Sequence, residues 1–182
     1  MKRLYDLVLA LIASSLLIVP LAVVAVLVKL TSKGPVLYWS DRVGRYNTIF
    51  NMPKFRSMEL ETPVVATHLL VDPRSVLTPI GDFLRKSSLD EFPQLWCILK
   101  GDMSFVGPRP ALFNQDDLID LRVAKGVDKV LPGLTGWAQV NGRDELPILE
   151  KVTLDIEYME RQSFGFDMKI LWLTFLKVLG QD

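Results

Sequence analysis

The sequence contains one cysteine and one histidine, Cys97 and His68, among 182 residues. One cysteine excludes an intramolecular disulfide and a cysteine-rich zinc site, and one histidine excludes a histidine cluster or an HExxH zinc motif. The sequence has no Walker A loop and no GxGxxG fingerprint, which argues against the common nucleotide-binding folds. Chemistry must therefore rest on carboxylates, lysines and arginines, together with a hard cation such as Mg²⁺ if a metal is used.

An excess of positive charge is also missing. Lysine plus arginine and aspartate plus glutamate both number 21, so the net charge is zero. A neutral balance gives no support for binding nucleic acid through a general basic field. The chain is long enough for one domain with a modest core, and no internal repeat or low-complexity segment divides it.

A long apolar run near the N-terminus is the clearest physical signal. From Leu4 to Leu30 the only exceptions are Asp6, Ser14, Ser15, Pro20 and Lys29. About 20 apolar residues are enough to cross a bilayer, so a single membrane-spanning anchor is the simplest interpretation. A cleaved signal peptide fits less well, because no small-residue cleavage site follows the run.

Two features favour a helix that enters the membrane and returns on the same side. Pro20 lies near the middle of the run, where it should kink the helix. Basic residues flank both ends, and positive charge marks the cytoplasmic side; these residues are Lys2, Arg3, Lys29 and Lys33. Ser14 or Ser15 can assist bending by a bond to a carbonyl one turn earlier. We therefore expect a membrane-inserted helix over residues 1–33, broken near Pro20, and a cytoplasmic, membrane-associated catalytic domain over 34–182.

The rest of the chain predicts an α/β domain that is mostly helical, with a small β-hairpin. The hairpin is expected from two strands at 36–43 and 48–55, followed by a loop over 59–76. Helices are expected near 77–85, 91–100, 113–125 and 149–160. Residues 164–179 are apolar but interrupted by lysines, which is typical of an amphipathic helix lying at the membrane interface.

Two adjacent carboxylates, Asp90 and Glu91, lie where the helix over 91–100 is expected to begin. One interpretation is a capping box, in which Ser88 caps the helix and Glu91 reaches back. Pro93 makes that start awkward, because it suits the first turn of a helix better than the second. The other interpretation is catalytic: the positive end of a helix dipole keeps Asp90 ionised and also suits phosphate.

Basic residues recur around this stretch. Arg42, Arg45, Lys54 and Arg56 fall on the expected hairpin, where they form either a solvated face or an anion-binding wall. Arg109 stands between two prolines that fix its backbone. A guanidinium held in this way can grip phosphate with two parallel hydrogen bonds, although an ordinary surface ion pair is the simpler alternative.

Three motifs together resemble the bacterial sugar transferases, the monotopic phosphoglycosyl transferases. They are Leu89-Asp-Glu91, Leu99-Lys-Gly-Asp-Met-Ser-Phe-Val-Gly-Pro-Arg-Pro110 and Pro132-Gly-Leu-Thr-Gly-Trp-Ala-Gln-Val-Asn-Gly-Arg143. The resemblance covers nearly the whole chain, and motifs of this length are very specific. It departs from the family in one place, because the Ser-Pro pair at which the family's membrane helix breaks is Val19-Pro20 here.

The resemblance implies a reaction and a location. An undecaprenyl-phosphate glycosyl-1-phosphate transferase moves a sugar 1-phosphate from a UDP-sugar to undecaprenyl phosphate and releases UMP. It works at the bacterial inner membrane, with its catalytic domain on the cytoplasmic face in contact with membrane lipid. No nucleic acid is involved. Self-association into a homo-oligomer is compatible with the exposed apolar helices.

The resemblance also implies roles for individual residues. Asp90 would be the nucleophile that forms a covalent aspartyl intermediate, with Glu91 as its partner in the dyad. Mg²⁺ would be the cofactor, with Asp90 as a metal ligand. Phosphate groups would be held by Arg109, with Lys54, Arg56, Arg85 and Arg143 as further candidates in the same pocket.

Two rival functions follow from the same residues. The first is a membrane-anchored scaffold of a glycan assembly complex that has lost catalysis. The second is a different membrane enzyme, such as a lipid phosphatase or a glycosyl transferase that moves sugar without phosphate.

Overall fold

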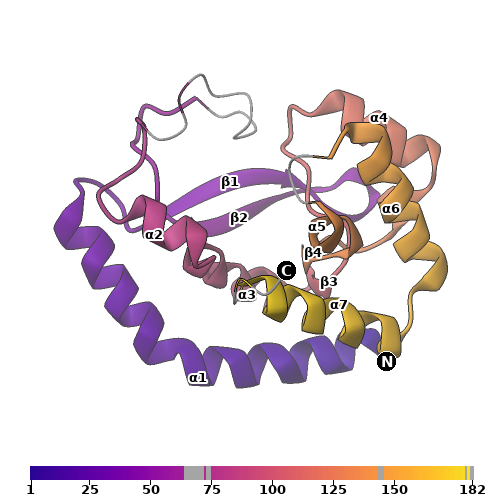
Figure 1. Ribbon diagram of the computed structural model, residues 1–182, viewed down its shortest axis with the longest axis horizontal. Coiled ribbons are helices and arrows are strands. Elements are labelled where there is room, and N and C mark those ends of the chain that lie inside the picture. The colour runs from indigo at the N-terminus through magenta and orange to yellow at the C-terminus, as the bar shows by residue number, and fades with distance from the viewer. Residues whose placement is uncertain (64–71, 73–74, 143–145, 179, 181–182) are drawn as a thin grey trace.

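A computed structural model describes residues 1–63, 72, 75–142, 146–178 and 180. One long helix, α1 (Lys2–Thr31), lies along one edge of the molecule, and the other elements lie to one side of it (Figure 1). The strands are β1 (Leu37–Val43), β2 (Ile49–Phe55), β3 (Ser104–Val106) and β4 (Gly133–Thr135). The other α-helices are α2 (Gly81–Lys86), α3 (Leu95–Lys100), α4 (Asp116–Ala124), α5 (Trp137–Asn141), α6 (Ile148–Arg161) and α7 (Phe164–Val178). Short 3-10 helices cover Arg45–Asn47, Leu89–Gln94 and Val127–Lys129.

Helix α1 is long and apolar enough to cross a membrane. It continues through Pro20 as one helix instead of breaking there, and Figure 1 shows it bending near its middle. The hydroxyl of Ser15 donates to the carbonyl of Leu11 at 2.8 Å, one turn earlier, which confirms the bond expected of Ser14 or Ser15. Bonds of this kind often bend helices.

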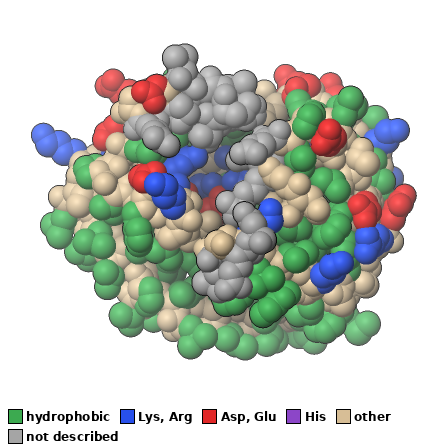
Figure 2. Space-filling model, viewed as in Figure 1, with side chains coloured by type: hydrophobic (Ala, Val, Ile, Leu, Met, Phe, Trp, Pro, Cys, Tyr) green, Lys and Arg blue, Asp and Glu red, His purple; other side chains and the backbone are tan. Residues whose placement is uncertain are grey.

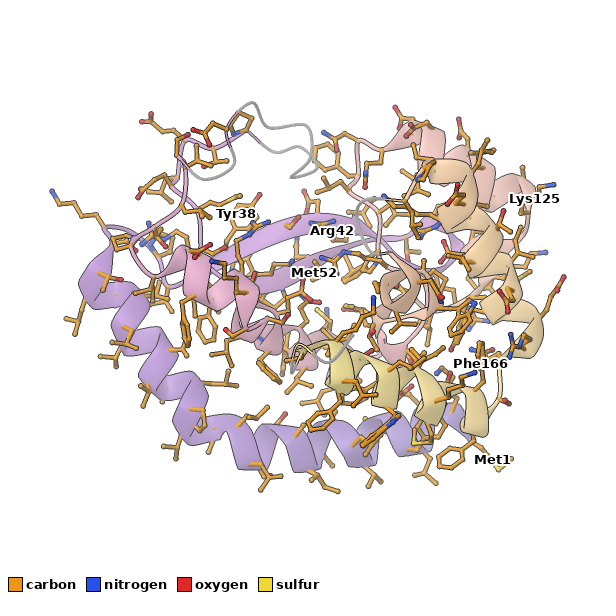
Figure 3. All side chains as sticks on the ribbon, viewed as in Figure 1. Met1, Tyr38, Arg42, Met52, Lys125 and Phe166 are labelled. Carbon is orange, nitrogen blue, oxygen red and sulfur yellow. The ribbon has the colours of Figure 1, made fainter. Side chains whose placement is uncertain are left out.

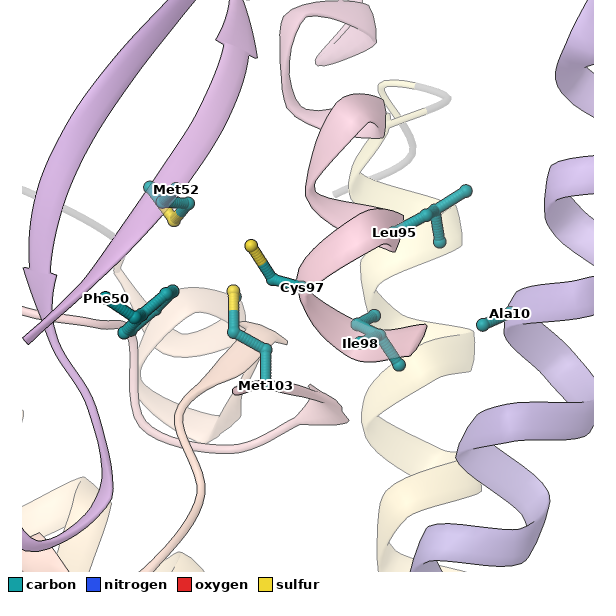
Figure 4. Close-up of a cluster of buried hydrophobic side chains, with 7 residues drawn as sticks. All are labelled: Ala10, Phe50, Met52, Leu95, Cys97, Ile98 and Met103. Carbon is teal, nitrogen blue, oxygen red and sulfur yellow. The ribbon is translucent and has the colours of Figure 1, made fainter. Parts of the chain in front are cut away.

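One face of α1 packs on the domain along its whole length. Asp6, Ala10, Val24 and Val28 are buried at helical spacing. Ala10 joins a cluster with side chains from β2 and α3, which Figure 4 shows in close-up. The opposite face leaves its apolar side chains exposed; these are Leu4, Val8, Leu11, Ile12, Leu16, Ile18, Val19, Val23, Val26, Leu27 and Leu30. Figure 2 shows hydrophobic side chains along this edge of the molecule.

The predicted hairpin is present. β1 and β2 pair antiparallel, with Leu37 opposite Phe55 and Val43 opposite Ile49. The helices predicted near 77–85, 91–100, 113–125, 149–160 and 164–179 are also present as α2, α3, α4, α6 and α7, with shifted ends. α7 has buried residues on one side and exposes Phe164, Trp172, Phe175 and Val178 on the other, so its two faces differ.

A second, parallel sheet was not predicted. β3 and β4 pair through Ser104 with Gly133 and Val106 with Thr135. The two strands approach so closely that a Cβ atom on Gly133 would lie 2.1 Å from the backbone nitrogen of Gly107. This close approach explains why glycine recurs in both motifs that contain the strands. The pairing brings the Gly-Pro-Arg-Pro loop beside α5.

Candidate active site

A cavity of about 510 Å³ opens between the hairpin, the 3-10 helix over Leu89–Gln94, the loop after β3, and helices α5 and α7. Its charged lining residues come from well-separated parts of the chain and are Arg42, Lys54, Arg85, Asp90, Glu91, Arg109, Arg122 and Lys151. Figure 2 shows acidic and basic side chains gathered in a hollow on this face, and Figure 3 labels Arg42 on β1. Another part of the wall is apolar, formed by Phe92, Phe105, Leu134, Leu171 and Val178.

The local backbone rejects the capping-box interpretation. Ser88 precedes the 3-10 helix with a left-handed backbone, at φ 56°, and its side chain makes no capping hydrogen bond. Pro93 is accommodated because this segment is a 3-10 helix, and the α-helix begins only at Leu95. The side chain of Glu91 turns away from the helix end toward two cations. The dyad therefore belongs to the cavity and does not serve as a helix cap.

Glu91 is held by Lys54 and Arg109. Its Oε1 atom accepts from Lys54 Nζ at 2.8 Å and from Arg109 Nη2 at 2.9 Å. Burial acts to raise the pKa of Glu91, but Arg109 and Lys54 outweigh it and hold that pKa well below its usual range. Burial lowers the pKa of Lys54, and Glu91 opposes this effect. Glu91 is thus a fixed negative charge that organises two cations.

Asp90 has a different environment one residue away. It is 6% exposed and lines the cavity. Within the described part of the chain, no side chain or backbone group donates a hydrogen bond to it. Burial raises the pKa of Asp90, with a further rise from Glu91, while Lys54, Arg85 and Arg109 oppose the shift. A buried carboxylate that has cations nearby but accepts no hydrogen bond can react with an electrophile or bind a cation.

The loop that carries Arg109 is fixed at successive carbonyl groups. The carbonyl of Pro108 accepts from the Gly133 backbone nitrogen at 2.9 Å, and that of Ala111 accepts from the Val43 nitrogen at 3.0 Å. Between them, the Arg109 carbonyl accepts from Arg122 at 2.8 Å, and the Pro110 carbonyl accepts from Arg42 at 3.3 Å. The guanidinium of Arg109 is therefore presented from a rigid backbone, as its flanking prolines predicted.

Arg56 lies elsewhere than the sequence predicted. It is 2% exposed, and its guanidinium donates to the carbonyls of Lys33 and Ser32 and to the Ser32 hydroxyl, the last at 2.7 Å. It therefore closes the C-terminal end of α1 and does not line the cavity. Arg56 follows the last residue of β2, and its backbone nitrogen donates to the Val36 carbonyl at 3.0 Å, which places it next to the segment that leaves α1.

Most of the other predicted site residues lie at the cavity. Lys54, Arg85, Asp90, Glu91 and Arg109 come together at the cavity, and Arg143 lies outside the described residues. Sequence reasoning missed Arg122 and Gln139, which also line the cavity. Gln139 falls inside the third quoted motif, so a signal for it existed. Arg122 lies on a helix with no clear apolar face, and nothing in the sequence marked it.

The residues of this cavity could hold Mg²⁺ only if substrate phosphates and water supply the other ligands. The described residues contain no group of three or more acidic, histidine or cysteine side chains that could enclose a metal. Mg²⁺ is usually held by one or two carboxylates together with substrate phosphates and water. Asp90 can supply one carboxylate, since the described residues leave it without a hydrogen-bond donor.

Comparison with known proteins identifies the family. The model of the bacterial sugar transferase family matches residues 1–181. The chain belongs to the bacterial sugar transferase family. Within that family, it is 42% identical over 97% of its length to the UDP-glucose:undecaprenyl-phosphate glucose-1-phosphate transferase of Escherichia coli (strain K12), of which it covers 40%. It is 38% identical over 82% of its length to the undecaprenyl-phosphate galactose phosphotransferase of Salmonella typhimurium, of which it covers 34%.

A shorter relative covers the same range as this sugar transferase chain. The uncharacterized sugar transferase EpsL of Bacillus subtilis (strain 168) is 40% identical over the whole chain, which covers 89% of EpsL. The chain thus spans about two fifths of the Escherichia coli relative and most of EpsL. The region shared by these bacterial sugar transferases contains both the dyad and the cavity around it.

Proposed function

We propose that the protein transfers a sugar 1-phosphate from a UDP-sugar to undecaprenyl phosphate, releasing UMP and giving undecaprenyl-diphosphate-sugar. The observation that carries the proposal is the environment of Asp90, a buried carboxylate on a cavity wall beside Lys54, Arg85 and Arg109. One relative is named as a UDP-glucose:undecaprenyl-phosphate glucose-1-phosphate transferase and another as an undecaprenyl-phosphate galactose phosphotransferase, which supports the same reaction class.

The reaction proceeds in two displacement steps at one phosphorus atom. An Asp90 carboxylate oxygen attacks the β-phosphorus of the UDP-sugar, the bond from this phosphorus to the bridging oxygen breaks, and UMP leaves with that oxygen. An oxygen of undecaprenyl phosphate then attacks the same phosphorus, and the bond to Asp90 breaks. Asp90 is regenerated as a carboxylate, and no proton is gained or lost at the aspartate in either step.

The cations around Asp90 support both steps. Negative charge accumulates on the phosphoryl oxygens as each bond forms, and preorganised cations lower the energy of that state. Arg109 is suited to this role because its backbone is fixed and because a guanidinium matches phosphate geometry. Glu91 holds Lys54 and Arg109 at their places. When bound, Mg²⁺ would be held by Asp90 and the donor diphosphate, and it would neutralise charge on the diphosphate.

The way in which α1 is attached supports a re-entrant helix with both ends on one side of the membrane, and the basic residues at both ends favour the cytoplasmic side of the bacterial inner membrane. At its N-terminal end, Arg3 donates to the carbonyls of Ile98 and Leu99, and Asp6 accepts from the Ser104 hydroxyl at 3.0 Å. At its C-terminal end, Arg56 closes the helix. A helix that crossed a bilayer would place these two ends about 30 Å apart on opposite sides. Here both ends contact one domain.

A labelling experiment tests this topology. Cys97 is buried, so a Cys97→Ala background gives a clean baseline. Cysteines are placed at Lys33, which is exposed, and in a short extension ahead of Met1. In sealed inner-membrane vesicles of known orientation, both cysteines should react with an impermeant maleimide from the cytoplasmic side only. Labelling of the two positions from opposite sides would replace the re-entrant helix with a spanning one.

The reaction is tested by UMP release from purified protein with undecaprenyl phosphate, Mg²⁺ and a panel of UDP-sugars. UMP release that requires the lipid and one particular sugar is the expected result. Release of UDP would indicate plain glycosyl transfer without phosphate. Release of neither nucleotide, with no phosphorus-linked sugar trapped on Asp90, would favour the catalytically inactive scaffold.

A further inference from the structure

A buried ion pair lies directly behind the Arg109 loop. Arg122 on α4 directs two nitrogen atoms, Nε at 2.9 Å and Nη2 at 2.7 Å, to one oxygen of Asp155 on α6. Its third nitrogen, Nη1, donates to the backbone carbonyl of Arg109 at 2.8 Å. Asp155 is 1% exposed, and the Arg122 side chain is 12% exposed. The three nitrogen atoms of the guanidinium are thus each engaged.

Stability alone is a weak explanation for this pair. Removing two charges from water is expensive, and a buried ion pair is often no more stabilising than apolar side chains of similar size. Helices α4 and α6 already pack through an apolar cluster containing Ala111, Leu118 and Val152. Burial raises the pKa of Asp155, against which Arg122 acts, so the charged state depends on the pair remaining intact.

We infer that Arg122 and Asp155 are positioning residues for Arg109, and through it for the dyad. Asp155 fixes the guanidinium of Arg122, which fixes the Arg109 carbonyl, and the side chain of Arg109 holds Glu91 at 2.9 Å. The pair therefore determines where the phosphate-binding guanidinium stands relative to Asp90. These contacts use three of the five N–H groups of Arg122, and we assign its effect on the donor to the Arg109 carbonyl that it holds. This inference rests on the proposed function for its kinetic readout.

A double-mutant cycle tests the inference. Arg122→Gln is made alone and together with Arg109→Ala, and kcat/KM for the UDP-sugar is measured. Alone, Arg122→Gln should lower kcat/KM by roughly 10- to 100-fold, because small misplacements of a catalytic group have effects of that size. In the Arg109→Ala background, the further loss should be about threefold or less. Equal losses in both backgrounds would overturn the inference.

A second variant separates positioning from folding. The double substitution Arg122→Met with Asp155→Leu removes both charges and keeps the volume, so the unfolding midpoint should stay near that of the native protein. Activity should nevertheless remain as low as in Arg122→Gln. Recovery of activity together with stability would mean that the pair has only a structural role. Glu160→Gln, an exposed carboxylate on the same helix, is the matched control and should change neither quantity.

The same double-mutant cycle can be measured through the affinity for UDP instead of through turnover. Affinity for UDP, measured by calorimetry, should fall with Arg122→Gln in the native background and change little in the Arg109→Ala background. If the native protein binds UDP but releases no UMP with any sugar, the proposed function fails while this cycle still decides the inference. Additive losses of UDP affinity would overturn the positioning role independently of turnover.

Discussion

Two buried aspartates have different surroundings. Asp90 lies in the cavity, and Asp167 on α7 lies where the N-terminal end of α1 is held, a contact called here the anchor of α1. Asp167, at the anchor, is 0% exposed and is contacted by Lys2, Tyr5 and Tyr158, the last at 2.8 Å. Asp90, at the cavity, is 6% exposed and receives no hydrogen bond from the described residues. Burying a carboxylate without partners costs stability. The contrast is expected if Asp90 is kept available for reaction and Asp167 has a structural role.

The two members of the dyad, Asp90 and Glu91, also differ in how far their charge is matched by partners. Glu91 has its charge matched by Lys54 and Arg109, and its pKa is held well below the usual range. Burial raises the pKa of Asp90. Environments that push the pKa values of two adjacent acids apart are a common sign that they have different roles. Under the proposed function, Asp90 would be the reacting group and Glu91 the organising charge, and four experiments can break or sharpen this comparison.

The largest effect is expected from Asp90→Asn. It should lower UMP release by about 10³-fold or more, because an amide cannot act as the nucleophile. The unfolding midpoint should stay equal or rise, since a neutral amide avoids the burial of a charge. Asp82→Asn, an exposed carboxylate on α2, is the control and should keep full activity. Residual activity within about tenfold of the native value would remove Asp90 as nucleophile.

Asp167→Asn should have the opposite profile. Loss of this charge leaves Lys2 without its counter-ion and should lower the free energy of unfolding by about 3 kcal/mol. The activity of the molecules that remain folded should be close to native, because Asp167 does not line the cavity. Chemical denaturation in detergent measures the first quantity, and UMP release per folded molecule measures the second. A large loss of activity without a loss of stability would contradict the comparison.

The effects of Glu91→Gln on activity and on stability should lie between those of Asp90→Asn and Asp167→Asn. It removes the charge that holds Lys54 and Arg109, so we expect a loss of about 1–3 kcal/mol in the free energy of unfolding and a reduced kcat/KM. The folded-state pKa of Glu91 is depressed, so its stabilisation is present above the unfolded pKa of about 4.3 and is lost as pH falls through the folded value. The stability difference between variant and native protein should therefore be constant near neutral pH and shrink below about pH 4. A difference that grows in acid would contradict this assignment.

The smallest effect is a shift in the pH dependence of activity. Only the ionised form of Asp90 is nucleophilic, and burial raises its pKa, so the acid limb of kcat/KM should lie above the ordinary aspartate value of about 3.9. Arg85 opposes the rise, so Arg85→Gln should move the limb to higher pH. Lys86→Gln, in an exposed ion pair next to it, should leave the limb in place. Movement of the limb to lower pH in Arg85→Gln would contradict this account.

The features that depend on residues close together in the sequence could be predicted. The hairpin, most helices and the dyad follow from periodicity, turn residues and adjacent carboxylates. The pairing of β3 with β4 could not be predicted, because strands of three residues are too short to show alternation. The position of Arg56 depends on its contacts with Lys33 and Ser32, which are 23 and 24 residues away and which no local pattern shows. The contact of Arg122 with Asp155 spans 33 residues and two helices, and no pattern encodes such a distance.

The anchor at Asp167 also constrains the order in which the molecule can assemble. Lys2 and Asp167 are separated by 165 positions, so their contact cannot form until α7 has left the ribosome. α1 is synthesised well before that moment, and its exposed apolar face can enter the bilayer at once. Contacts of the N-terminal end of α1 with Leu99 and Ser104 can form earlier, once α3 and β3 have been synthesised. Docking of that end onto α7 comes after these contacts, because α7 follows α3 and β3 in the chain.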